Sequence, residues 1–207
     1  MHDQFALDSD STTPLCATLI ALSMSQLGAH KIRDLRDELW KTTGNPSFLT
    51  LFPLIPLLWT KIGSRLPRAL QLPALRTPPT IHPEPCHSQG SLFLPVQDAG
   101  QLQLMRNILS EWYRQTVESQ SDSPPPVLPF PMQSAAVYLG ADSPTARQRV
   151  QEVSERLKLQ STPIKDFRLV TIDMQTTSDW QRDFRYQVWQ DRHLSIGNQT
   201  HRHIEST

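Results

Sequence analysis

The sequence predicts an α+β protein whose two halves share one layout of strands and helices. Residues 47–59 form the longest apolar run of the chain, and residues 130–140 have a similar layout in which prolines precede a short β-prone run. Before, between and after these runs, apolar residues at helical spacing indicate amphipathic helices. Each half is therefore predicted to run strand, helix, strand with additional strands, although no string of residues is repeated.

The first half is expected to begin with a strand followed by a helix. Residues 15–24 are apolar with several β-branched side chains, which favours a central strand but leaves a helix open. Ile32, Leu35 and Leu39 then recur at helical spacing, and the Gly-Asn-Pro sequence at residues 44–46 ends the helix. We interpret five charged residues of this helix as a solvated face with local ion pairs: Arg33, Asp34, Arg36, Asp37 and Glu38.

The apolar run at residues 47–59 predicts a buried strand. It is interrupted by prolines, and its dozen or so apolar positions fall short of the ~20 residues that a membrane helix needs. Prolines also bracket residues 68–72, which suits an edge strand. Residues 77–89 are expected to form a loop, and residues 91–96 another strand.

Two further helices carry capping signals. Asp98 is placed to cap the first of them. Its predicted apolar face consists of Leu102, Met105, Leu109 and Trp112. Ser143 followed by proline predicts the start of a helix over residues 144–159. Residues 167–174 and 184–189 alternate as strands and are expected to pair as a hairpin with a wide loop.

Length, charge and cysteine content limit the classes of function. The 207 residues suffice for one domain with a substantial core, which we place at residues 15–197 with a connector at about 118–129. Residues 1–14 and 198–207 are polar and are expected to be flexible ends. Equal numbers of basic and acidic residues, 20 of each, argue against strong nonspecific binding to nucleic acid. Two cysteines, no membrane span and no signal peptide predict a soluble cytoplasmic protein.

The order of the predicted elements resembles the two-histidine phosphoesterase superfamily, which includes the 2′-5′ RNA ligase-like proteins and the cyclic nucleotide phosphodiesterases. Members of that family have two lobes, and each lobe contributes a strand with a His-x-Thr or His-x-Ser motif. Residues 46–52 and 130–140 of this chain resemble the two motif strands. The resemblance covers about residues 15–197. It implies a bilobal domain of pseudo-twofold duplicated β-α-β units, with antiparallel sheets that form a central groove.

The two family histidines are replaced in this chain. The resemblance places Phe48 and Ala136 at the histidine positions, and Thr50 and Tyr138 at the hydroxyl positions that hold phosphate oxygens in the family. Phenylalanine and alanine transfer no proton near neutral pH, so the family's hydrolysis should be lost, at ~10²–10⁴-fold for each missing group. The resemblance thus implies a noncatalytic protein without cofactor or metal. These four residues would bind a nucleotide, an RNA end or a protein partner.

Two alternatives remain open at this stage. One is an active RNA or cyclic-nucleotide phosphoesterase that takes its histidines from elsewhere, for instance His82, His87 or His193. The other is an unrelated α+β interaction module. Cys86 lies between the first two histidines, but the spacing matches no zinc pattern, and we interpret this segment as a solvated connector. The tryptophans are expected to pack mostly at core edges rather than stack on bases: Trp40, Trp59, Trp112, Trp180 and Trp189.

Overall fold

The computed structural model describes residues 15–24, 26–97, 100–118, 136–164, 166–177 and 184–194. The elements in chain order are β1 (Leu15–Met24), α1 (Gln26–Thr43), η1 (Pro46–Phe48), β2 (Leu54–Thr60), β3 (Thr80–Ile81), β4 (Cys86–Ser88), β5 (Ser91–Gln97), α2 (Gln101–Tyr113), η2 (Arg114–Glu118), β6 (Ala136–Ala141), α3 (Pro144–Arg156), β7 (Thr162–Pro163), β8 (Phe167–Thr176) and β9 (Phe184–Leu194). These three α-helices and two antiparallel sheets confirm the expected α+β class.

Some predictions concern positions that the structure does not describe. They are the N-cap at Asp98, Trp180, the lead-in at residues 1–14, nearly all of the connector at about 118–129, and the tail at 198–207. Of the β-prone segment at residues 130–140, the described part begins at Ala136.

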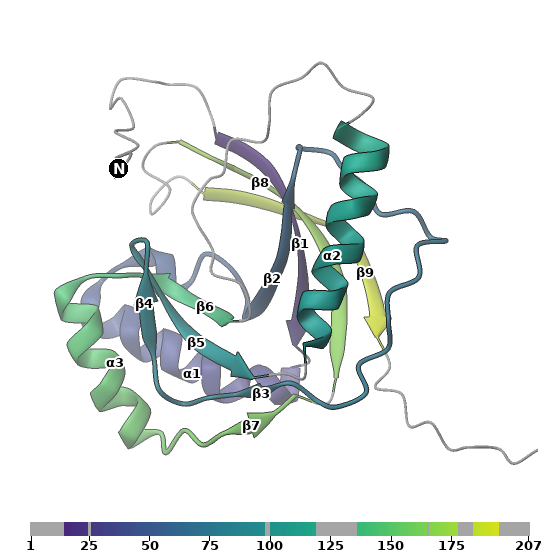
Figure 1. Cartoon of the computed structure of the whole chain (residues 1–207). Helices are drawn as coiled ribbons and strands as arrows, with labels where there is room; N and C mark the ends of the chain where they lie inside the picture. Colours follow the sequence, from purple (N-terminus) through teal and green to yellow (C-terminus); the bar gives the residue numbers. More distant parts are fainter. Residues whose placement is uncertain are drawn as a thin grey trace, which may run out of the picture.

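The strands form two antiparallel sheets that each combine distant parts of the chain. The four-stranded sheet has the order β2-β1-β8-β9. The five-stranded sheet has the order β4-β5-β3-β7, and β6 pairs with β5. Because β1 pairs with β8 and β5 pairs with β6, each sheet contains strands from both sides of the connector. Both halves of the sequence therefore contribute strands to both sheets (Figure 1).

The helices cover the sheets with the apolar faces that the sequence predicts. Ile32, Leu35 and Leu39 of α1 are buried, as are all four predicted residues of α2. The Ser143 side chain accepts a hydrogen bond from the Ala146 N–H and caps α3 as expected. Figure 1 shows α2 beside the four-stranded sheet, and α1 and α3 beside the five-stranded sheet.

The long predicted strands are confirmed. Residues 15–24 form β1, which pairs along its whole length with β8. The alternating segments near the C-terminus form β8 and β9, which pair as a hairpin from Phe167 opposite Leu194 to Thr176 opposite Phe184. Residues 91–97 form β5.

The prediction of one strand over residues 47–59 is wrong for its first half. The Asn45 side chain accepts a hydrogen bond from the Ser47 N–H at 3.0 Å and starts a 3-10 turn, η1, where the strand was expected. The chain becomes extended only at Leu54, where β2 begins. An apolar run without periodicity indicates burial but not the type of element. Phe48 is buried as predicted, but in a turn rather than in a strand.

Two smaller predictions are also wrong. Residues 68–72 form no strand. The expected loop at residues 77–89 contains the short strands β3 and β4. A two-residue turn, Gln89-Gly90, joins β4 to β5 with φ values of 48° and 75°. Positive φ at both positions is the signature of a type I′ hairpin turn, which glycine adopts readily at the second position.

Candidate functional site

The four residues singled out by the resemblance lie on η1, the turn after it, and β6. Phe48 is 1% exposed, Ala136 2% and Tyr138 1%. Thr50 is half-buried, and its hydroxyl donates to the Ser47 carbonyl at 2.9 Å. Three of the four side chains are therefore core residues in this structure, and Thr50 alone of the four has appreciable exposure.

The two segments that carry these residues lie in direct contact. A methyl group built on Gly140 of β6 would lie 2.6 Å from Cε1 and 2.9 Å from Cγ of Phe48, so only a glycine leaves room for the ring. Next to it, the buried Ser47 hydroxyl accepts a hydrogen bond from the Ala141 N–H at 2.7 Å. The chain thus brings together two regions more than ninety residues apart.

Apolar side chains from both sheets surround Ala136 and Tyr138. The Tyr138 ring meets Phe93 of β5 edge-on, with ring centroids 6.0 Å apart. Burial raises the pKa of the Tyr138 hydroxyl well above its ordinary value, so it remains neutral. The cluster comprises Leu19, Ala21, Leu51, Leu54, Phe93, Ala136, Tyr138, Val170, Ile172 and Met174.

Arg36 of α1 hydrogen-bonds both segments, the turn after η1 and β6. Only 3% exposed, it donates from Nε to the Leu139 carbonyl at 2.9 Å and from Nη1 to the Leu51 carbonyl. The interpretation of Arg36 as part of a solvated face is therefore wrong. A signal was present, because Arg36 lies four residues after Ile32 and so on the apolar stripe of the helix.

Burial lowers the pKa of Arg36 to about 10, although neighbouring Tyr138 and Asp37 act in the opposite direction. The guanidinium is still protonated at neutral pH. Its Nη2 atom is buried and has no hydrogen-bond acceptor among the described residues. A buried cationic donor without a partner costs free energy, so an acceptor brought to this atom by a small movement of the side chain would be stabilising.

A cavity of about 240 Å³ lies against Arg36, and we call it the arginine pocket. It is lined by Arg33, Arg36, Asp37, Phe48, Leu49, Leu51, Phe52, Pro53 and Tyr186. Arg33 and Asp37 are exposed on its rim. Two arginines against one aspartate leave its walls with a net positive charge, which favours an anionic ligand.

One wall of the arginine pocket is aromatic. Tyr186 of β9 is 45% exposed, and its ring meets Phe52 at a centroid distance of 6.3 Å and an angle of 63°. Phe184 lies behind it at 6.0 Å. An exposed ring held by two others offers a flat surface on which a planar ligand can stack.

The described histidines lie outside the arginine pocket. His82 Nε2 hydrogen-bonds Gln97 Oε1 at 2.9 Å, and His87 Nδ1 lies 3.8 Å from Asp142 Oδ2. His193 is on β9 opposite Arg168, but its side chain is not described. Among the described residues, no three His, Cys, Asp or Glu side chains gather as they would around a metal ion.

The tryptophans differ in their surroundings. Trp112 is buried at 8% exposure, in line with packing. Trp40 and Trp189 are 41% and 50% exposed, and the Arg65 guanidinium lies 4.4 Å from the centre of the Trp189 ring. Within the described segments, none of the helices has the length and apolarity needed to cross a membrane.

Neither the protein-family models nor the curated proteins include one similar to this sequence.

Proposed function

We propose that this chain is a noncatalytic binding protein of the two-histidine phosphoesterase type that holds a phosphate-bearing ligand, a nucleotide or an RNA end, in the arginine pocket. The observation that carries the proposal is the buried Arg36 guanidinium, whose Nη2 lacks an acceptor beside a cavity with a second arginine. Phosphate oxygens are the acceptors that paired arginines bind best.

The rest of the pocket suits the remainder of a nucleotide. Tyr186 presents an exposed ring to a base, and stacking of this kind contributes ~1–3 kcal/mol per base. Arg33 on the rim reaches solvent and can meet a phosphate as it arrives. The negative charge of Asp37 offsets one of the two arginines, so the pocket has a small net positive charge that suits a single phosphate group rather than a long polyanion.

The residues that line the pocket also support the proposal that the protein does not hydrolyse phosphodiesters. Among the residues whose side chains the structure describes, no histidine lines the arginine pocket. Phe48 does line it, but a phenyl ring neither donates nor accepts a proton near neutral pH. The strand that follows the first motif region, β2 (Leu54–Thr60), also contains no histidine, so an alignment shifted onto this strand gives the same result. A bound phosphodiester would therefore lack the pair of histidines that serves as general acid and base in the family.

Calorimetric titration with adenosine 5′-monophosphate and with adenosine tests the proposal. The monophosphate should bind and adenosine should bind at least tenfold more weakly, because adenosine lacks the group that the arginines recognise. Arg33→Gln should weaken monophosphate binding roughly tenfold, or ~1.4 kcal/mol, and Tyr186→Ala by a similar factor. Both side chains are exposed, so both variants should fold. Arg149→Gln on α3 removes another exposed arginine and should change nothing.

Turnover is measured on the same protein with uridine 2′,3′-cyclic phosphate. The proposal expects no hydrolysis above the buffer rate. Hydrolysis that disappears on replacing His82 or His87 would instead establish an active phosphoesterase. In the titrations above, equal affinity for adenosine and its monophosphate would show that the arginines do not bind the phosphate group.

A further inference from the structure

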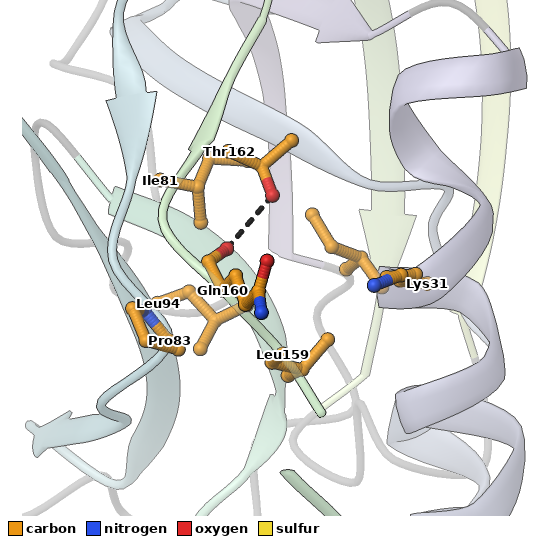
Figure 2. Close-up of a pocket in the computed structure, with 8 residues that line it drawn as sticks. Lys31, Ile81, Pro83, Leu94, Leu159, Gln160 and Thr162 are labelled. Carbon is orange, nitrogen blue, oxygen red and sulfur yellow. Dashed lines mark hydrogen bonds between the residues drawn. The ribbon is translucent and has the colours of Figure 1, made fainter. Parts of the chain in front are cut away.

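A second cavity, separate from the arginine pocket, is lined in part by Lys31 and Ile32 of α1. Its volume is about 270 Å³. Its walls are formed by Lys31, Ile32, Ile81, Pro83, Leu94, Leu159, Gln160 and Thr162. Figure 2 shows Lys31 and α1 on one side and Pro83 and Leu94 on the other. The two pockets have no lining residue in common, so a ligand here would be additional to the proposed phosphate ligand.

The floor of this cavity is apolar and fixed. Ile32 and Ile81 are 4% exposed and Leu94 is 1% exposed, so all three belong to the core. A cavity of ~150 Å³ lined by such residues holds a benzene molecule, and by simple scaling this one holds roughly ten non-hydrogen atoms. The size and lining fit a small bicyclic or branched apolar group.

The polar groups of the cavity are few. The Thr162 hydroxyl is occupied, since it donates to the Gln160 carbonyl at 2.7 Å. The Lys31 ammonium reaches only the Lys158 carbonyl, at 3.5 Å, and no carboxylate of the described residues lies within ion-pair distance of it. In Figure 2 the Gln160 side-chain amide and the Lys31 ammonium face each other across the cavity.

We propose that this cavity binds a small apolar carboxylate, with the hydrocarbon part against Ile32, Ile81 and Leu94 and the carboxylate between Lys31 and Gln160. One ammonium group matches one negative charge, and an amide N–H supplies a second donor to the same carboxylate. A phosphate dianion fits this cavity less well, because it would bring two charges and further acceptor oxygens to a site with a single cation.

The probe for this site is 2-naphthoate, compared with neutral 2-naphthamide of the same shape, and binding is measured by calorimetry on the whole chain. Naphthoate should bind at least tenfold more tightly than naphthamide. Lys31→Gln should abolish that difference by weakening naphthoate alone, whereas Lys31→Arg should preserve it. Lys41→Gln, at an exposed lysine on the same helix, is the matched control and should leave both affinities unchanged.

Variants that fill the cavity test whether the two probes bind in it rather than elsewhere on the protein. Leu159→Trp and, on the opposite wall, Pro83→Trp should each weaken both probes at least tenfold, with folding checked by circular dichroism. Arg33→Gln, which lies in the arginine pocket, should leave naphthoate binding unchanged, so this inference can fail without the proposed function failing. Naphthoate that binds equally well to both tryptophan variants, or to Lys31→Gln, overturns the inference, as does no binding at millimolar concentration.

Discussion

Replacing Gly140 by alanine should destabilise the protein through one neighbouring side chain. The new methyl group would lie 2.6 Å from Cε1 of Phe48, well inside van der Waals contact, and the ring is only 1% exposed. Over-packing of this kind costs ~1–3 kcal/mol. We therefore expect Gly140→Ala to lower the free energy of unfolding by about 2 kcal/mol.

A double-mutant cycle isolates the contact. Phe48→Leu removes part of the ring and should cost about 1–2 kcal/mol by itself. In the double variant the methyl group occupies space that the ring has left, so the combined loss should be smaller than the sum, with a coupling of about 1–2 kcal/mol. Urea denaturation followed by circular dichroism measures each free energy. Phe167→Leu, at a buried phenylalanine on β8, should combine additively with Gly140→Ala.

Additive losses in the Gly140 and Phe48 cycle would refute the packing described above, because two residues that do not touch have no reason to couple. A Gly140→Ala variant as stable as the wild type would do the same. Either result would mean that the two segments on which the resemblance to the phosphoesterases is based are not in contact at Phe48 and Gly140.

Two other predictions concern polar groups. Burial on its own would raise the pKa of Asp173, but hydrogen bonds led by that from Arg65 outweigh it and hold the pKa below its ordinary value of 3.8. The resulting stabilisation is present above pH 4 and is lost as the pH falls through the lowered pKa, so Asp173→Asn should remove about 1 kcal/mol of the difference in stability between pH 7 and pH 3. Ser47→Ala should cost about 1–3 kcal/mol in urea denaturation, because it leaves the buried Ala141 N–H without an acceptor. Thr42→Ala, at an exposed hydroxyl, should cost less than about 0.5 kcal/mol.

The elements predicted correctly are those with local signals. Periodic apolar residues such as Ile32 and Leu35 defined α1, and the Ser143 cap fixed the start of α3. Alternation in β8 and β9 was sufficient to predict their pairing. In each case the residues that determine the element lie within a few positions of one another in the sequence.

The candidate site could be predicted much less well, because it depends on contacts between distant segments. The sequence drew attention to Phe48 and Tyr138, but both are enclosed by packing that no local pattern reveals. Arg36 was assigned to solvent because charged residues surround it in sequence, whereas the Leu51 and Leu139 carbonyls bind it inside. Tyr186 lines the pocket from a strand that begins far along the chain.

Arginine side-chain NMR tests the central claim most directly, since it observes the buried guanidinium without altering the protein. In protein labelled with ¹⁵N-arginine, adenosine 5′-monophosphate should shift the Arg36 and Arg33 side-chain resonances in a saturable manner, and adenosine should not. If the monophosphate binds while the Arg36 resonance stays in place, or if no arginine resonance responds at millimolar ligand, the arginine pocket is not a phosphate site.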